Sequence, residues 1–127
     1  MLTRLNLTVL FSSVFFLSSN TFAATKPVSQ EKIKGAIEKG AKFLYQNQNA
    51  TGWWSDPGLP ALTGLALVAL EMADATKLDA KYQSERRRAY DYLTSLAKPD
   101  GAIHDGRLIN YNTACSLMAL SVANKTR

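Results

Sequence analysis

Residues 39–54 read KGAKFLYQNQNATGWW, and the predicted fold follows from this stretch. It joins the end of an amphipathic helix to a glycine turn, and two tryptophans come directly after the turn. The spacing of Leu44, Gln48 and Trp54 lets one apolar side chain, one amide and one indole meet around a single turn. An amide packed on an indole satisfies its polar groups while it excludes water. We therefore interpret the stretch as a packing device.

The stretch lies between a predicted outer helix and a predicted inner helix. Ser29 can cap the outer helix, which runs to about Gln48. One stripe of this helix follows steps of three and four residues and comprises Ile33, Ile37, Ala41, Leu44 and Gln48. Pro60 suits the first turn of the inner helix. Residues 61–73 carry one charge, Glu71, and a helix that is apolar nearly all round is a buried helix.

A second pair of helices repeats this order. Residues 74–83 read as a polar connection, after which Ser84 or a near neighbour opens a third, outer helix. Asn112 or Thr113 then starts a fourth helix, and residues 113–123 contain no charge. The predicted order is therefore outer, inner, outer, inner.

The second pair matches the first residue by residue. At an offset of 49 residues, the matches are Phe43-Leu44 with Tyr92-Leu93, Gly52 with Gly101, and Asp56 with Asp105. At an offset of 50, they are Thr63 with Thr113, Leu67 with Leu117, and Ala69-Leu70 with Ala119-Leu120. A repeated helical hairpin cannot bury its inner helix alone. We therefore expect an all-α fold of two tandem hairpins, residues 33–73 and 84–123, covered by further repeats or by self-association.

The first hairpin resembles the QW repeat of squalene–hopene and oxidosqualene cyclases, whose superfamily includes the β subunits of protein prenyltransferases. The residues that carry the resemblance are Gly40, Phe43, Leu44, Gln48, Gly52 and Trp54. The second copy is degraded, because Ala97 stands in place of the Gln and Ile103 in place of the Trp. The resemblance covers residues 33–123. It implies a partial α/α toroid in which the six residues of the first copy lock neighbouring repeats together.

The chemistry of this superfamily needs residues that the chain does not carry. The cyclases protonate their substrate with a DxDD segment, and no two aspartates are adjacent here. The prenyltransferases bind zinc through an Asp two residues before a Cys, where this chain has Thr113 before Cys115. One Cys and one His cannot supply the three ligands of a zinc site. We therefore predict no catalytic residue, no metal and no cofactor.

Four other residues invite a catalytic interpretation and favour a structural one. Asp56 and Asp105 could pair as acid and base, but equivalent positions after a turn favour equivalent structural roles, such as an Asx-turn. We interpret His104 as a hydrogen-bonded loop residue. Cys115 lies in the apolar fourth helix, where a thiol acts as a small hydrophobe.

Three residues are candidate ligand contacts: Trp53, Tyr111 and Asn112. Trp53 adjoins the motif, and the other two stand where the fourth helix begins and main-chain N–H groups are free. Capping of that helix is the interpretation that we favour for Asn112. The ligand expected from the resemblance is isoprenoid-like, and a peptide is the other candidate.

The first residues predict export. Arg4, the apolar run 7–17 and the small residues that end at Ala23 are typical of a secretory signal peptide, residues 1–23. A membrane span needs about 20 apolar residues, so an uncleaved anchor is the weaker alternative. Residues 24–32 are the linker and the start of the first helix. We expect a secreted or periplasmic protein without a transmembrane span.

Charge argues against nucleic acid as a partner. The chain has 15 basic and 10 acidic residues, a net charge of +5, and the basic residues are scattered except for Arg86-Arg87-Arg88. These three point to different faces of a helix, so we interpret them as solvated. Nucleic-acid binding needs clustered basic residues with interleaved aromatics.

The sequence thus predicts an exported helical-repeat protein that acts as a non-catalytic scaffold or as a binding module for an apolar ligand or partner. The alternative is a terpenoid cyclase or prenyl-handling enzyme whose catalytic acid lies in repeats outside this chain.

Overall fold

The computed structural model describes residues 27–73 and 76–125, and within these ranges the chain forms four α-helices and no β-strand. The helices are α1 (Gln30–Gln46), α2 (Pro60–Met72), α3 (Thr76–Ser95) and α4 (Ile109–Lys125). The predicted all-α fold built from helical hairpins is confirmed. The predicted signal peptide, residues 1–23, and the first part of the predicted linker lie outside the described residues.

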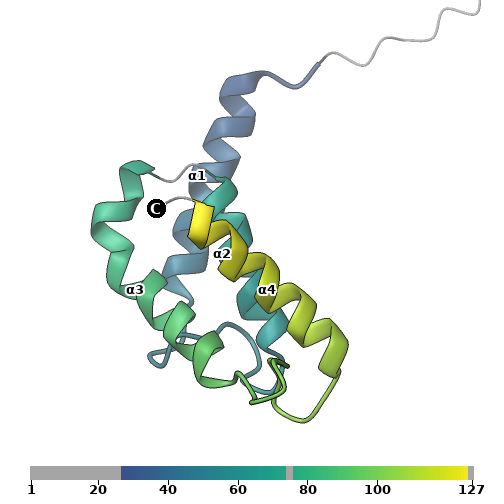
Figure 1. Cartoon of the computed structure of the whole chain (residues 1–127). Helices are drawn as coiled ribbons and strands as arrows, with labels where there is room; N and C mark the ends of the chain where they lie inside the picture. The colour runs from purple at the N-terminus through teal and green to yellow at the C-terminus, as the bar shows by residue number, and fades with distance from the viewer. Residues whose placement is uncertain (1–26, 74–75, 126–127) are drawn as a thin grey trace, which may run out of the picture.

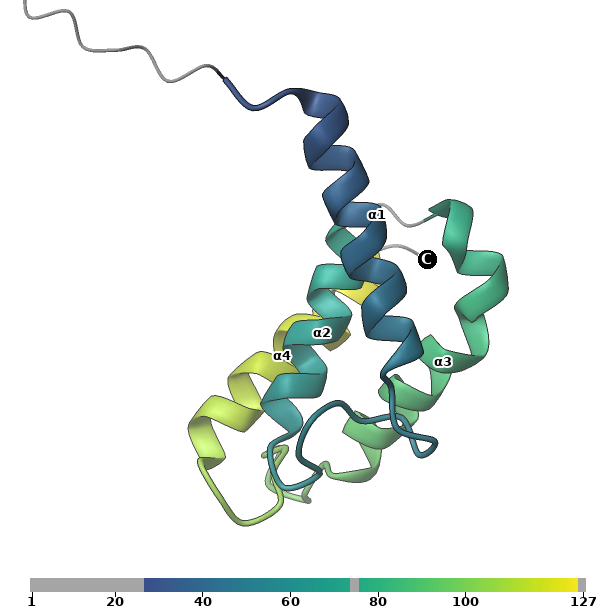
Figure 2. The ribbon, with the colours of Figure 1, turned by 180° about the vertical axis from the view of Figure 1, so that it is seen from behind.

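The two hairpins are α1–α2 and α3–α4, and α2 is the central helix of the structure. α2 packs most extensively on α4 and also contacts α3 and α1. Figure 1 shows α4 on one side of α2 and α3 on the other. The loops 47–59 and 96–108 lie together at the end of the molecule where α2 and α4 begin (Figures 1 and 2). We call this end the loop end.

The core lies between α2 and the two outer helices. Leu67 of α2 and Leu93 of α3 are fully buried, and Trp54 from the first loop packs into the same cluster. Tyr45 of α1 stacks on Tyr82 of α3, with the ring centroids 4.3 Å apart and the planes 6° from parallel. Each large apolar side chain buried in this way stabilises the fold by about 1.5–3 kcal/mol.

Only the second half of α1 packs against this core. Ala41 and Tyr45 are buried, whereas Ile33 and Ile37, which belong to the same predicted stripe, are exposed. The first turns of α1 extend beyond the other helices (Figure 2). The stripe therefore continues past the part of the described chain that could cover it.

The inner helices are buried on some sides only. Their composition is typical of buried helices. Leu65 of α2 is 40% exposed, and Leu117 and Met118 of α4 are each 50% exposed. Within the described residues, two hairpins supply neighbours for only part of the circumference of each inner helix, which is the partial cover that the sequence predicts for a repeated hairpin without further units.

The third and fourth helices begin earlier than predicted. α3 starts at Thr76, because residues 76–81 contain good helix formers despite their polarity. Tyr82, with φ −116° and ψ 18°, interrupts it. The segment predicted to open near Ser84 is thus the part of α3 after the kink. α4 starts at Ile109, one turn before Asn112.

The loops after α1 and α3 have the same hydrogen bonds. Gly52 N donates to Asn49 O at 2.9 Å, and Gly101 N donates to Lys98 O at 2.9 Å. Both glycines have positive φ, +106° and +88°. A second bond closes each loop, from Asn49 N to Trp53 O at 2.9 Å and from Lys98 N to Ala102 O at 2.7 Å. All of these pairs are related by an offset of 49 residues.

The start of each inner helix is joined to its loop in the same way. Trp54 N donates to Thr63 Oγ1 at 3.1 Å, and Ile103 N donates to Thr113 Oγ1 at 3.0 Å. Trp54 and Ile103 are both buried. A smaller apolar side chain thus occupies the second loop at the position where the first loop has its tryptophan.

Candidate functional site

Gln48 joins the first loop to α3. Its Nε2 donates to the main-chain oxygen of Gly52 at 2.9 Å and to that of Glu85 at 2.8 Å. Arg88 donates to its Oε1 at 3.4 Å. Both amide hydrogens and the amide oxygen are therefore engaged within the chain, which links the first hairpin to the second.

Gly52 and Trp54 complete this link. A Cβ at Gly52 would lie 2.2 Å from the main-chain oxygen of Arg88, and the φ of Gly52 favours glycine, so no larger residue fits without a backbone shift. Trp54 is buried, and its Nε1 donates to Leu44 O at 2.7 Å. Leu44 O is among the last carbonyls of α1, a part of a helix that lacks full intrahelical partners.

Gly40 and Phe43, the other two motif residues, take no part in these hydrogen bonds. Phe43 is 63% exposed. A Cβ at Gly40 would meet nothing within 4 Å. Both positions are exposed, so the link rests on Leu44, Gln48, Gly52 and Trp54.

Asn112 lies inside the contact between α2 and α4. It is fully buried, its Oδ1 accepts from Ala61 N at 3.1 Å, and its Nδ2 donates to Arg107 O at 2.7 Å. Asn112 therefore caps α2 across the interface between α2 and α4. The prediction that it caps its own helix, α4, is wrong. Its amide is occupied by the chain itself.

The other two candidate ligand contacts remain accessible. Trp53 is partly buried, and Tyr111 is exposed on the first turn of α4. Within residues 27–73 and 76–125, no hydrogen bond or ring contact joins them.

An ion pair connects the two loops at the loop end. Arg107 donates to Asp56 Oδ2 at 3.0 Å and to Oδ1 at 3.3 Å, and Gly58 N donates to Oδ1 at 2.7 Å. The Gly58 hydrogen bond, followed by Arg107, lowers the pKa of the Asp56 carboxyl. No sequence pattern pointed to Arg107, because its pairing with Asp56 depends on two loops lying together in the fold.

His104, and not Asp105, accepts the hydrogen bond expected just after the glycine turn of the second loop. Gly106 N donates to His104 Nδ1 at 2.9 Å, just as Gly58 N donates to Asp56. The predicted equivalence of Asp56 with Asp105 is therefore displaced by one residue. Asp105 is exposed. The imidazole acts as a loop acceptor, in line with the structural interpretation.

A second charged cluster lies between α2 and α3. The side chain of Glu71 is 5% exposed, and its Oε1 accepts from Arg86 and, at 3.0 Å, from Tyr90 Oη. Burial and the neighbouring Glu71 raise the pKa of the Tyr90 hydroxyl. A lone carboxylate in an apolar helix requires such a partner, and this was the signal that could have found the pair.

The arginine triplet is not simply solvated. Arg86 pairs with Glu71, and Arg88 contacts Glu85 at 3.6 Å as well as Gln48. Arg87 is exposed. The interpretation of a solvated face is therefore wrong for Arg86, because α3 turns that side chain toward α2.

The single cysteine of the chain, Cys115, lies on α4. Cys115 is a free, buried thiol. The described residues hold no group of three His, Cys, Asp or Glu side chains placed to bind a metal ion. None of the helices in the described ranges is both long enough and apolar enough to cross a membrane.

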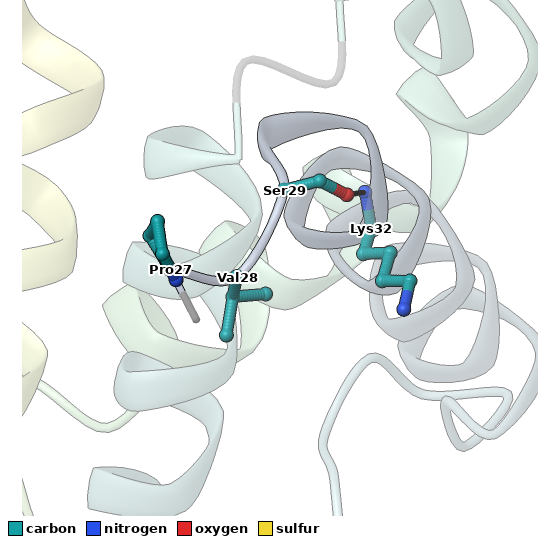
Figure 3. A pocket seen from close by; sticks show the side chains of 4 residues that line it. All are labelled: Pro27, Val28, Ser29 and Lys32. Carbon is teal, nitrogen blue, oxygen red and sulfur yellow. Dashed lines mark hydrogen bonds between the residues drawn. The ribbon is translucent and has the colours of Figure 1, made fainter. Parts of the chain in front are cut away.

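A hollow at the start of α1 is formed by Pro27, Val28, Ser29 and Lys32 (Figure 3). Ser29 Oγ accepts from Lys32 N at 3.3 Å and so caps the helix, as predicted from the sequence. The hollow contains no acid–base pair, and its hydroxyl is already used.

Comparison of the chain with protein-family models, curated proteins and solved structures gives no match. The geometry of its residues therefore carries the functional argument.

Proposed function

We propose that this chain is an exported helical-repeat protein, similar in design to the α/α toroids of terpenoid cyclases and prenyltransferases. It acts as a non-catalytic scaffold or binding module. The observation that carries the proposal is the open apolar surface of the two inner helices. Leu65, Leu117 and Met118 are each 40–50% exposed, on helices that contain almost no charge.

The shared loops support the repeat design. The hydrogen bonds around Gly52 and Gly101 coincide at an offset of 49 residues, and those of Thr63 and Thr113 follow one residue later. A duplicated unit whose inner helix has open sides is typical of repeat proteins, in which neighbouring units bury a continuous core.

The polar side chains of the loop end support a role without catalysis. Asp56 is paired with Arg107, Asn112 is enclosed, and His104 accepts a hydrogen bond from its own loop. A general base needs a free acceptor within reach of a substrate proton. Here the acceptor atoms of Asp56, Asn112 and His104 are already engaged within the chain.

Turnover and binding distinguish this proposal from an enzyme. The purified protein is incubated with squalene and, separately, with farnesyl diphosphate, and products are sought by mass spectrometry. No product is expected. Farnesol and an amphipathic helical peptide are then titrated, with tryptophan fluorescence as the readout, and one of them should give saturable, stoichiometric binding. Formation of a cyclised or prenyl-transferred product would overturn the proposal in favour of the enzyme alternative.

A matched pair of variants locates the binding surface. Leu117→Asp places a charge on the open face of α4 and should abolish the binding. Phe43→Asp places the same charge at an exposed position of α1 and should leave it unchanged. Equal binding by both variants would show that the inner-helix face is not the site.

Export is tested on the amino terminus. Expression of the full chain in a bacterial host, followed by sequencing of the periplasmic product, should give Ala24 as the first residue. Recovery of the chain in the cytoplasm with Met1 retained would contradict the export part of the proposal.

A further inference from the structure

We propose that the open faces of α2 and α4 bind each other between copies of this chain, so that the protein assembles head to tail. The inference rests on the proposed repeat design and names the partner of the inner helices. Its basis is an equivalence: the face that each inner helix exposes corresponds, in the repeat, to the face by which the other inner helix packs. The two open faces should therefore fit each other.

The α2–α4 contact inside the chain sets the geometry. Gly64 lies against the backbone of α4, and a Cβ on it would be 2.6 Å from Cys115 O. Ala119 is fully buried, and the Asn112 side chain bridges to Ala61 N. α2 thus uses the side that contains Gly64, and α4 uses the side that contains Cys115 and Ala119.

The 50-residue offset maps each side onto the other helix. The α2 residues Gly64 and Leu67 are buried, while their equivalents in α4, Ala114 and Leu117, are exposed. Val68 is partly buried, and its equivalent, Met118, is 50% exposed. The open face of α4 is therefore equivalent, under the 50-residue offset, to the face of α2 that packs on α4.

The reverse relation also holds. Cys115 and Ala119 are buried in α4, and their equivalents in α2, Leu65 and Ala69, are exposed. Met72, one turn further along the same face of α2, is exposed as well. The open face of α2 is therefore equivalent, under the same offset, to the face of α4 that packs on α2. Each copy has one open face of each kind.

These two faces fit a second copy better than an unrelated protein. Bringing α4 of one copy against α2 of the next pairs the same two kinds of face as the contact inside the chain, but with Ala114 in place of Gly64, so the two helices lie further apart than α2 and α4 do within one chain. The residues on both faces are uncharged, so association buries no unpaired charge. Such a contact is heterologous, and it closes into a ring or continues as a filament according to the rotation between copies.

The geometry predicts which residues meet. Because Gly64 contacts Cys115 within the chain, Ala114 of one copy should lie beside Leu65 of the next copy. The sequence contains one cysteine, Cys115. Cys115→Ala therefore gives a background in which new cysteines report contacts between copies, provided that circular dichroism shows the same helical content.

In this background, Ala114→Cys and Leu65→Cys proteins are prepared separately, mixed, and treated with a short bis-maleimide. We expect a cross-linked dimer in the mixture and none in either protein alone. Lys42→Cys, at an exposed position of α1, is the matched control and should give no dimer with either partner. Cross-linking of the Ala114→Cys protein with itself would show that two α4 faces meet, which overturns the head-to-tail arrangement.

Mass measured by sedimentation gives a readout that needs no cysteine. The unmodified protein should form a species heavier than one chain, Leu117→Arg should be monomeric with unchanged helical content, and Phe43→Arg should remain assembled. A monomer at every concentration that still binds farnesol or the peptide would overturn the second-copy inference and leave the proposed function standing. Turnover of squalene would overturn the proposed function, while the cross-linking result would still decide the assembly.

Discussion

The Gln48 side chain donates through Nε2 to the main-chain oxygen of Glu85, 37 residues further along the chain, at 2.8 Å. The same nitrogen donates to Gly52 within its own loop. One amide therefore connects the turn after α1 to the outer helix of the next hairpin. The second loop has Ala97 at the equivalent position, which has no amide to offer.

Gln48→Ala should lower the free energy of unfolding by about 1–3 kcal/mol, because the two hydrogen bonds that Nε2 donates each contribute about 0.5–1.5 kcal/mol and the longer bond accepted from Arg88 adds little. Urea unfolding followed by circular dichroism measures the change. Gln46→Ala, at the exposed end of α1, is the control and should stay within about 0.5 kcal/mol of the parent. Equal costs for the two substitutions would show that the amide does not link the hairpins.

Gly52→Ala and Gly101→Ala separate backbone strain from close approach. Both glycines have positive φ, which costs a non-glycine residue about 1–2 kcal/mol. Only Gly52 also lies against a backbone oxygen, whereas a Cβ at Gly101 meets nothing within 4 Å. We expect about 1–2 kcal/mol for Gly101→Ala and about 2–5 kcal/mol for Gly52→Ala. A larger loss at Gly101 would contradict the packing of the first loop on α3.

Asn112→Ala should destabilise the protein by about 2–4 kcal/mol, since Ala61 N and Arg107 O would lose a buried partner. Asn110→Ala changes an exposed amide in the same turn of α4 and should cost less than about 0.5 kcal/mol. Thermal unfolding of the two variants in parallel provides the comparison. If Asn112 instead served a ligand, its removal would leave unfolding unchanged and weaken binding alone.

Alkaline pH should lower the stability of the protein through Tyr90. Its pKa in the folded protein is raised by burial and by Glu71, so the neutral hydroxyl favours folding. That contribution is complete below the unfolded pKa of about 10 and is lost as pH rises above it. Tyr90→Phe removes the titrating group, and its stability should fall less between pH 9 and pH 11, two values on either side of about 10. Parallel pH profiles for parent and variant would refute the role of Tyr90.

The periodic parts of the chain could be predicted from the sequence. Pro60 begins α2 as expected, and Ser29 caps α1. These features are local, because a cap or a helix start depends on residues within one turn. The paired loops could be predicted as well, since Gly52 and Gly101 stand at the same offset as their neighbours.

The remaining features depend on contacts that a sequence pattern does not encode. The pairing of Asp56 with Arg107 joins residues 51 positions apart. Asn112 was expected to cap its own helix, but the close packing of α4 on α2 brings the amide to Ala61 instead. The early start of α3 shows that a polar segment can be helical without an apolar stripe.

The Gln48 side chain joins the first hairpin to the second through its hydrogen bonds to Gly52 and Glu85. The most direct measurement is the set of nuclear Overhauser contacts from the Gln48 side-chain amide protons in isotope-labelled protein. Contacts to residues 85–89 of α3, together with contacts to the Gly52 loop, are the predicted result. Contacts confined to the Gly52 loop, with none to α3, would contradict the link between the hairpins through Gln48.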